Sequence, residues 1–370
     1  MQRHSAWFRN MPGNTVILLL LAFFIIIPLL SSGCSCSGAH TGTIEPSRQE
    51  EAPQEETVDE EEEEDELEVV YIPGQEGKTE PGKAKVAFIK EGDVYIYDAV
   101  SGCVDRLTEL GDVIALAVMR DGSQIAYARE GTVGDFTYAI LETILPDGSG
   151  RREIMRDMVE EFISTISYTP DGAYLYYSEF PQYSGENIRR IDTRTGEVEC
   201  LDLNLYRGDH CETFGYPSVS PDGTMLACLH FVYGPQFHEP GASFIEVRLC
   251  LTELDGSNPR DLMTLSYDIR AMITSQPAWS PGGGTLACIG PGRQVWTVGK
   301  DGGNATQITK MGVPCISPDW NPDGDSITFK TVNPGYPQRG PIYTVSSTGG
   351  TPGIIHADEE ITDWSWMLVP

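Results

Sequence analysis

The stretch "SPDWNPDGDSITFK", Ser317–Lys330, decides the fold of this chain. Its centre, Asn321–Gly324, reads as a tight turn, because the proline presets φ at the first corner, the aspartate bonds nearby backbone and the glycine takes a positive φ. A segment with a tryptophan precedes the turn, and the short segment "DSITFKT" follows it. Two strands joined by such a turn predict a β-hairpin.

The same hairpin recurs along the chain from Lys83 onward. Equivalent turns are "RDG" at 120–122, "TPDG" at 169–172, "SPDG" at 220–223 and "SPGG" at 280–283. After each hairpin comes a third strand that ends in a glycine turn and then a short fourth strand, as in "QVWTVGKDGG" and "ATQIT". Four-stranded units that repeat at roughly 40 to 60 residues are typical of propeller blades.

A further unit at the front has "KVAFIK", "DVYIYDAVSG" and "VDRLTE" but no first strand before them. The C-terminal segment "TDWSW", 362–366, can supply that strand, with Trp364 in the place that Trp279 and Trp320 hold in their units. This pairing would leave no open sheet edge between the first and last units. We therefore expect an all-β fold, a six-bladed β-propeller over residues 83–370 closed by the C-terminal strand.

This repeat resembles the TolB-type, WD40-like β-propeller family. The resemblance rests on "QPAWSPGGGTLACIG…VWTVGKDGGNATQIT" and "SPDWNPDGDSITFK…IYTVSSTGGTPGII", and it covers about residues 83 to 370. It implies the propeller fold. It does not single out a function, because such repeats serve transport accessories, peptidase gating domains and sugar-active enzymes alike.

The first 34 residues have the order of a targeting segment. Arg3 and Arg9 precede the uncharged apolar run Thr15–Leu30, and "SSGC" ends at Cys34. This order resembles a bacterial lipoprotein signal, which implies cleavage before Cys34 and its lipidation. A plain secretory peptide and an uncleaved anchor helix are the alternatives. All three predict an extracytoplasmic chain, and we expect it to be anchored to the cell membrane, in the periplasm or on the outer surface.

Residues 35–82 are acidic and polar, with an unbroken acidic block at Asp59–Glu66. Such a segment cannot bury enough apolar surface to fold, so we expect a disordered stalk; docking or calcium buffering is the alternative. The net charge of −30 over the 370 residues also repels phosphate backbones, which disfavours nucleic-acid binding.

The chain offers no complete catalytic set. It contains no Gly-x-Ser-x-Gly nucleophile elbow; the nearest fragment, "GDSIT" at Gly324, ends in threonine. His230, His238 and Glu239 share the segment "LHFVYGPQFHEPGASF" and are weak candidates for a metal site. Their spacing matches no helical or tight-turn ligand pattern, so surface histidines in a loop are the favoured interpretation. We expect no cofactor.

The cysteines divide by their place in the repeat. Cys228 and Cys288 align with aromatic positions of other second strands and are expected to be buried. Cys200 and Cys211 flank the connection between the third and fourth units, and in an oxidising compartment they are the candidates for a disulfide.

The main functional hypothesis is a non-enzymatic, monomeric binding module for a protein, peptide or glycan in the cell envelope. Two aromatic insertions are the candidate binding loops. They contribute Phe180, Tyr183, Tyr233, Phe237 and His238. The alternatives are a propeller-fold enzyme, such as a metal-dependent polysaccharide lyase, and a sensor or accessory part of an envelope complex.

Overall fold

The computed structural model describes residues 84–98, 101–133, 136–158, 163–179, 186–207, 210–234, 244–266, 275–332, 340–356 and 361–368. The predicted targeting segment, residues 1–34, and the predicted stalk, residues 35–82, lie outside this part of the chain. All described residues belong to one compact unit.

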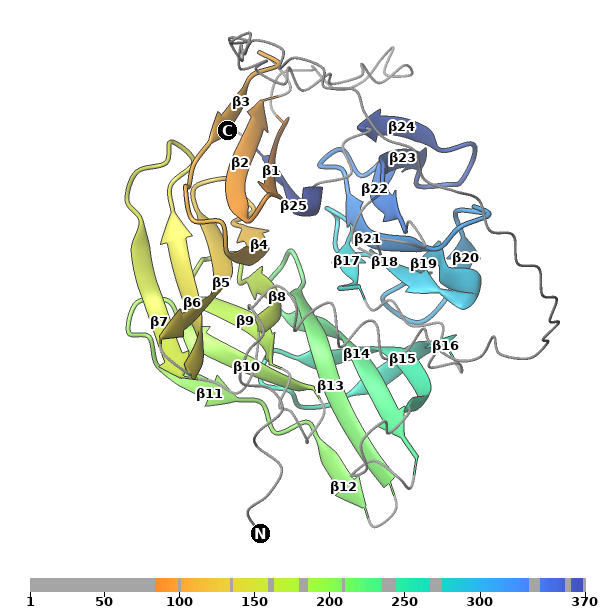
Figure 1. The fold of residues 1–370 in the computed structure, drawn as a ribbon. Helices are drawn as coiled ribbons and strands as arrows, with labels where there is room; N and C mark the ends of the chain where they lie inside the picture. The colour runs from red at the N-terminus through yellow and green to blue at the C-terminus, as the bar shows by residue number, and fades with distance from the viewer. Residues whose placement is uncertain are drawn as a thin grey trace, which may run out of the picture. The chain divides into compact units, whose positions relative to one another are not determined.

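Six antiparallel sheets form this unit, and each is one blade of a β-propeller (Figure 1). Blade one consists of β25 (Ile361–Leu368), β1 (Ala84–Lys90), β2 (Asp93–Asp98) and β3 (Val104–Arg106). Blade two consists of β4 (Val113–Val118), β5 (Ile125–Val133), β6 (Phe136–Ile144) and β7 (Arg152–Met158). Blade three consists of β8 (Ile163–Tyr168), β9 (Tyr174–Glu179), β10 (Asn187–Asp192) and β11 (Val198–Cys200).

The second half of the ring contains the most irregular blade. Blade four consists of β12 (Leu205–Arg207), β13 (His210–Val219), β14 (Met225–Tyr233), β15 (Phe244–Glu253) and β16 (Arg260–Ser266). Blade five consists of β17 (Ala278–Trp279), β18 (Thr285–Gly290), the 3₁₀ turn η2 (Pro291–Arg293), β19 (Gln294–Gly299) and β20 (Thr306–Gln307). Blade six consists of β21 (Cys315–Trp320), β22 (Ser326–Thr331), β23 (Ile342–Ser346) and β24 (Gly353–His356).

The hydrophobic core lies between the blades. A cluster of buried side chains lies between each neighbouring pair of blades and packs the two blades together. The cluster between blade six and blade one includes Ile342 and Trp364. The first strands of successive blades contact one another around the ring. Cys228 and Cys288 are at most 1% exposed, which confirms the prediction that they are core residues.

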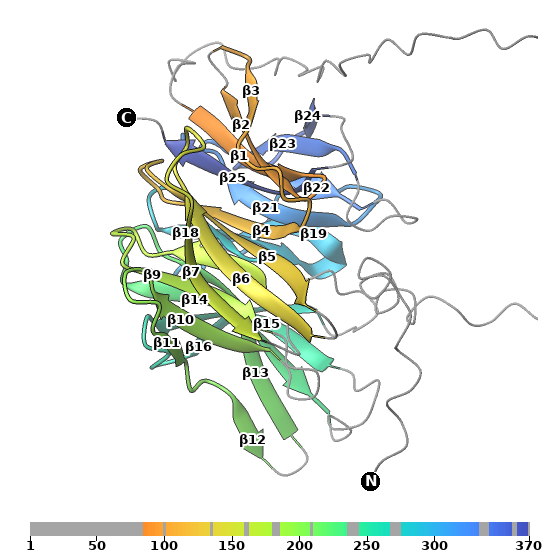
Figure 2. The same cartoon turned by 60° about the vertical axis from the view of Figure 1, so that its left-hand side comes forward.

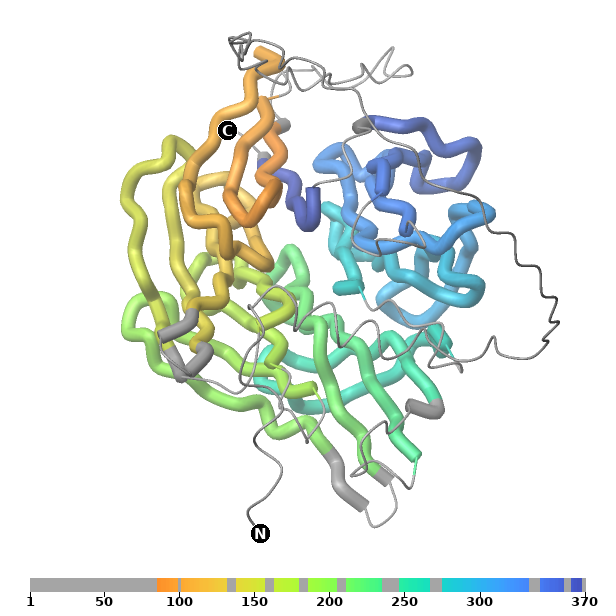
Figure 3. The backbone as a smooth tube through the Cα atoms, viewed as in Figure 1, coloured from red at the N-terminus to blue at the C-terminus, as the bar shows by residue number. Residues whose placement is uncertain are grey.

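The C-terminal strand closes the ring as the sequence predicted. β25 pairs with β1 from Ala84↔Leu368 to Lys90↔Ile361. Figure 3 shows the blue end of the chain lying beside the orange first strand. Asp363 on β25 accepts a hydrogen bond from Leu116 N of blade two at 3.1 Å, and Trp366 N donates to Asp319 of blade six at 3.4 Å. The closing strand is therefore tied to both neighbouring blades.

The register corrects one detail of the repeat alignment. Trp279 and Trp320 face Leu286 and Ile327 across the first hairpin, and the equivalent partner in blade one, Val86, faces Trp366. Trp366 therefore holds the place predicted for Trp364. In blades four and six a bulge before this position shifts the strand, with Tyr216 and Ser317 at φ values of 59° and 48° before a proline. β25 has no proline before its tryptophans, and its own irregularity lies earlier, between the pairs Lys90↔Ile361 and Ile89↔Asp363.

Blade four also departs from the predicted four strands. Its β12 adds a fifth strand beside β13, and β13, β14 and β15 are nine or ten residues long. Figure 2 shows β13 extending past the neighbouring blades, with β12 near its far end. This extended sheet carries several of the functional candidates.

Candidate functional site

The two ends of the blades differ in their connections. The tight turns between first and second strands all leave one end of the ring, here named the turn face. The connections between second and third strands, and those from one blade to the next, leave the opposite end, here named the loop face, because the strands of each blade are antiparallel. Within 84–368, every undescribed segment except 99–100 belongs to a loop-face connection. Both predicted binding loops therefore emerge on the loop face.

The structure joins the two predicted loops at their bases. Glu186 ends the connection of blade three and Tyr233 ends strand β14 of blade four, where the second loop begins. The Tyr233 hydroxyl donates a hydrogen bond to Glu186 Oε2 at 2.7 Å. Thr213 Oγ1 on β13 donates to the same oxygen at 2.8 Å. The connections of two neighbouring blades thus start from one shared, buried support.

The support formed by Glu186, Tyr233 and Thr213 is buried. Glu186 is 4% exposed and Tyr233 is 6% exposed. Burial raises the pKa of Glu186 above its usual range, although the hydrogen bonds from Tyr233 and Thr213 act in the opposite direction. Burial, together with the nearby Glu186, also raises the pKa of Tyr233 and raises that of Cys211 to about 12.

A second set of hydrogen bonds fixes the backbone of Glu186 and the neighbouring strand β13. The Asn204 amide donates to Glu186 O at 3.0 Å, and its carbonyl accepts from Phe214 N at 3.1 Å. Tyr216 N donates to Ser178 Oγ at 2.5 Å, which connects the bulge of β13 to blade three. Sequence patterns did not reveal Glu186, Thr213 or Asn204, because single polar residues in this part of the repeat carry no motif.

The predicted binding residues are only partly placed. Tyr233 is a buried anchor of the loop rather than an exposed contact. Phe180, Tyr183, Phe237 and His238 lie outside the described residues, as do Glu239 and Cys34.

His230 corrects the prediction of a loop histidine. It lies on β14, is 6% exposed, and stacks on Phe214 with ring centroids 4.4 Å apart. Its Nδ1 is 2.9 Å from Asp261 Oδ1, and its Nε2 is 3.5 Å from Glu212 Oε2. Among the described residues, no group of three or more His, Cys, Asp or Glu side chains could hold a metal ion.

The candidate disulfide is not formed. Cys200 and Cys211 are both free thiols. Cys200 is on the outer strand β11 of blade three, where it faces Arg189, whereas Cys211 is buried on β13 of blade four, between Tyr206 and Tyr233. The two cysteines therefore belong to different sheets.

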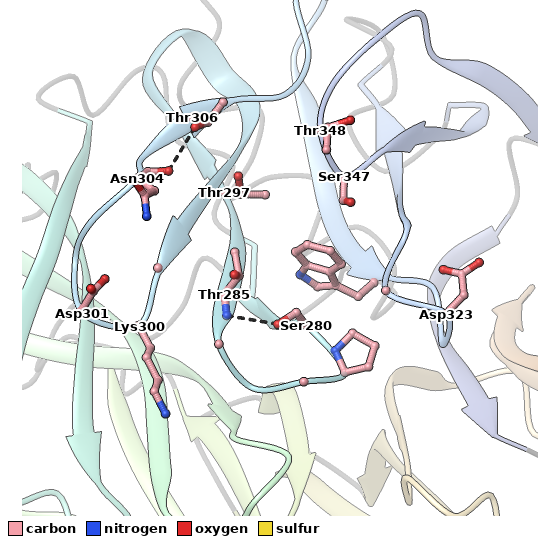
Figure 4. A pocket seen from close by; sticks show the side chains of 16 residues that line it. Ser280, Thr285, Thr297, Lys300, Asp301, Asn304, Thr306, Asp323, Ser347 and Thr348 are labelled. Atoms are coloured by element: carbon pink, nitrogen blue, oxygen red, sulfur yellow. Dashed lines mark hydrogen bonds between the residues drawn. The ribbon is translucent and has the colours of Figure 1, made fainter.

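A polar cleft of about 940 Å³ opens between blades five and six on the turn face. Figure 4 shows Lys300 and Asp301 on one side of it and Asp323 on the other, with Ser280, Thr285 and Thr297 between them. The Thr285 N–H donates to Ser280 Oγ at 3.1 Å, so part of this lining serves the turn itself. The cleft lies at the opposite end of the ring from the two predicted loops.

Within the described ranges, we find no helix with the length and apolar character needed to cross a membrane. The apolar run Thr15–Leu30 lies outside these ranges.

Comparison with known proteins identifies a shared fold. No family model matches the chain. The "Uncharacterized peptidase YuxL" of Bacillus subtilis (strain 168) is 30% identical over 115 residues, which is 30% of this chain and 16% of the peptidase. The chain thus covers far less than two thirds of this curated relative.

Solved structures extend the likeness over the whole propeller. TolB from Acinetobacter baumannii has a TM-score of 0.54 at 15% identity, covering 77% of this chain and 66% of that chain. A chain of the nidogen/laminin complex has a TM-score of 0.55 at 9% identity, covering 76% of this chain and 98% of that chain. The protein is a six-bladed β-propeller with the fold of the TolB propeller.

Proposed function

We propose that this protein is a non-enzymatic, extracytoplasmic binding module, tethered to the cell membrane, that holds a protein, peptide or glycan partner on the loop face of its propeller. The partner contacts the connections of blades three and four, which include Phe180, Tyr183, Phe237 and His238. The tether is a lipid on Cys34, or the uncleaved N-terminal apolar segment, and the acidic stalk separates the membrane from the propeller.

The hydrogen bond from Tyr233 to Glu186 carries this proposal. Burying a carboxyl group costs free energy unless it has partners, and such networks are retained where a fixed geometry is needed. Here the network joins Glu186 and Tyr233, the described residues that flank two aromatic-rich connections of adjacent blades. Loops on a rigid scaffold are common recognition elements, and a shared base fixes where both loops start.

The fold likeness to TolB and to a chain of the nidogen/laminin complex supports a role in binding, because the second of these structures is a complex between proteins.

Site-specific photo-cross-linking in intact cells tests the proposal. A photoreactive phenylalanine analogue replaces Tyr183 or Phe237 on the loop face, and Asp222, an exposed turn-face residue, serves as the matched control. We expect a defined cross-linked product from both loop positions and none from Asp222. Products from Asp222 alone, or from a position in the acidic block such as Glu61, would place binding elsewhere.

The same purified protein distinguishes the enzymatic alternative. A metal-dependent polysaccharide lyase forms an unsaturated sugar product when given an acidic polysaccharide and a divalent cation. We expect no such product. Its formation, and its loss after chelation, would contradict the non-enzymatic proposal.

A further inference from the structure

The polar cleft between blades five and six has the size of a small-molecule site. Its volume of about 940 Å³ lies within the range of about 300–1,000 Å³ that such sites occupy in proteins. Residues between 280 and 306 of blade five line one side of it, and residues between 320 and 348 of blade six line the other (Figure 4). The cleft is on the turn face, so it is separate from the connections proposed above to bind a partner.

Uncharged hydroxyl groups are the commonest polar groups in the cleft. They belong to Ser280, Thr285, Thr297, Thr306, Ser347 and Thr348. The turn of blade five uses one of them, since Ser280 Oγ accepts a hydrogen bond from Thr285 N. The hydroxyl groups of Thr285 and Ser347, both partly exposed, make no hydrogen bond with the described residues. A hydroxyl group both donates and accepts, so each side of the cleft offers one to the hydroxyl groups of a ligand.

The charged groups of the cleft favour a neutral ligand. Figure 4 shows Lys300 and Asp301 on one side and Asp323 on the other. An anionic ligand would meet two carboxylates and a single ammonium group, which disfavours phosphates and acidic sugars. A neutral molecule rich in hydroxyl groups meets no such repulsion, because its O–H groups donate to the carboxylates and its oxygens accept from the ammonium group.

Trp320 lines the cleft and differs from its counterpart in blade five. Trp279 Nε1 donates to Ser218 O of the preceding blade at 3.0 Å. Trp320 is equally buried, yet its Nε1 has no hydrogen-bond partner among the described residues. A buried donor without a partner costs free energy, which an oxygen of a bound molecule would offset. The indole also gives the cleft an apolar surface.

We propose that the cleft between blades five and six binds a neutral oligosaccharide. Trp320 forms the floor, where its ring packs against the C–H groups of a sugar. Thr285 and Ser347 bind sugar hydroxyl groups from the two sides, and Asp301 and Asp323 accept hydrogen bonds from others. This inference does not depend on the partner of the loop face, because the two sites lie at opposite ends of the ring.

Isothermal titration of the full chain tests the site, with neutral hexasaccharides of glucose, mannose and N-acetylglucosamine as probes. We expect at least one of them to bind once per chain. Gly284→Trp should lower the affinity at least tenfold, because Gly284 lines the cleft and no heavy atom lies within 4 Å of the position of its added Cβ. Gly312→Trp is the matched control, since this glycine has equally open surroundings on a loop-face connection.

Ser347→Ala removes one hydroxyl group from the cleft without adding bulk. Loss of one neutral hydrogen bond should weaken binding about 2- to 10-fold. Melting curves like that of the wild type will show that each variant is folded.

Three outcomes would overturn the proposal. The first is a wild-type protein that binds none of the neutral probes, and the second is equal affinity in wild type and Gly284→Trp. The third is binding of only charged oligosaccharides, tested with oligogalacturonate and chitosan. None of these substitutions alters the cross-linking positions of the loop face, so failure of one site leaves the other test intact.

Discussion

At the scale of single residues, Tyr233 fixes the end of β14, where the connection of blade four begins. Its hydroxyl donates a hydrogen bond to Glu186 of blade three. Tyr233→Phe removes the donor to Glu186 and leaves that buried carboxyl with Thr213 as its side-chain partner. We expect a loss of about 1–2 kcal/mol in the free energy of unfolding, because Glu186 is buried and loses one of its hydrogen-bond donors. Urea denaturation of the two proteins measures this difference.

Tyr168→Phe provides the control for that change. Tyr168 is also buried, and its hydroxyl donates to Gln124 Oε1 at 3.2 Å, but Gln124 is itself partly exposed and can bond to water instead. The free energy of unfolding should therefore fall less for Tyr168→Phe than for Tyr233→Phe. If both substitutions had the same small effect, the buried support between the loops would have no special energetic role.

The sequence predicted the role of residues that act together with their neighbours along the chain. The turn at Asn321–Gly324 formed as expected, with Gly324 at φ 74° and its N–H bonded to Asn321 O. Glu186 and the pair His230 and Glu212 could not be predicted in the same way. Their roles depend on contacts between strands or blades that are distant in sequence, and no spacing rule records such contacts.

At the scale of elements, the closing strand β25 has the largest expected effect. Deleting 362–370 exposes the partners of Trp364 and Met367, which are 7% and 1% exposed. Each buried side chain of this size contributes about 1.5–3 kcal/mol, and the deletion also removes the hydrogen bonds to blades two and six. The total is a large part of the stability of an ordinary domain, about 5–15 kcal/mol, so we expect the cooperative unfolding transition to be lost.

Calorimetry of the truncated protein measures this loss. Removing residues 369–370 alone, which lie beyond β25, should leave the transition unchanged. A protein without 362–370 that melted like the intact chain would refute closure by this strand.

The element pattern was predictable where the repeat is regular. Six blades and their closure followed from the turns and from the segment left over at the C-terminus. The fifth strand of blade four, β12, was not expected, although the Gly208-Asp209 pair before β13 has the pattern of a two-residue hairpin turn. Leu205–Arg207 is only three residues long, too short to show an alternating strand pattern. The position of Trp366 was missed because Asp-Trp occurs at both 319–320 and 363–364, which aligns Trp364 with Trp320. The register is set by strand pairing instead, in which Val86 faces Trp366.

At the scale of the whole molecule, the two faces of the ring have different connections. The turn face is built from tight proline and glycine turns that fix the hairpins. The loop face carries the connections between second and third strands and those between blades, and β13 of blade four continues past the neighbouring blades on this side (Figure 2). A single fold thus combines a rigid repeat with one irregular surface, and the proposed partner lies on that surface, at blades three and four.

The ring as a whole should lose stability as the pH rises from about 4 to about 7. Asp319 and Asp363 lie on the inner strands that meet where the ring closes, and burial raises their pKa values to about 7 and about 6. Backbone hydrogen bonds oppose this effect for both residues; the charge of Asp363 adds to it for Asp319, and Lys330 opposes it for Asp363. The folded protein therefore keeps protons that the unfolded chain, with an aspartate pKa near 3.8, releases above about pH 4.

From this difference it follows that the free energy of unfolding falls between about pH 4 and pH 7, as the two carboxyl groups ionise inside the ring. Asp319→Asn keeps an oxygen that can accept from Trp366 N but cannot ionise. We expect the variant to gain stability relative to wild type on going from pH 5 to pH 8, in urea denaturation at constant ionic strength. Asp222→Asn, at an exposed turn where hydrogen bonds lower the pKa, should show no such gain over this range. Parallel pH profiles for wild type and Asp319→Asn would show that Asp319 is already ionised throughout, with its backbone hydrogen bonds outweighing burial.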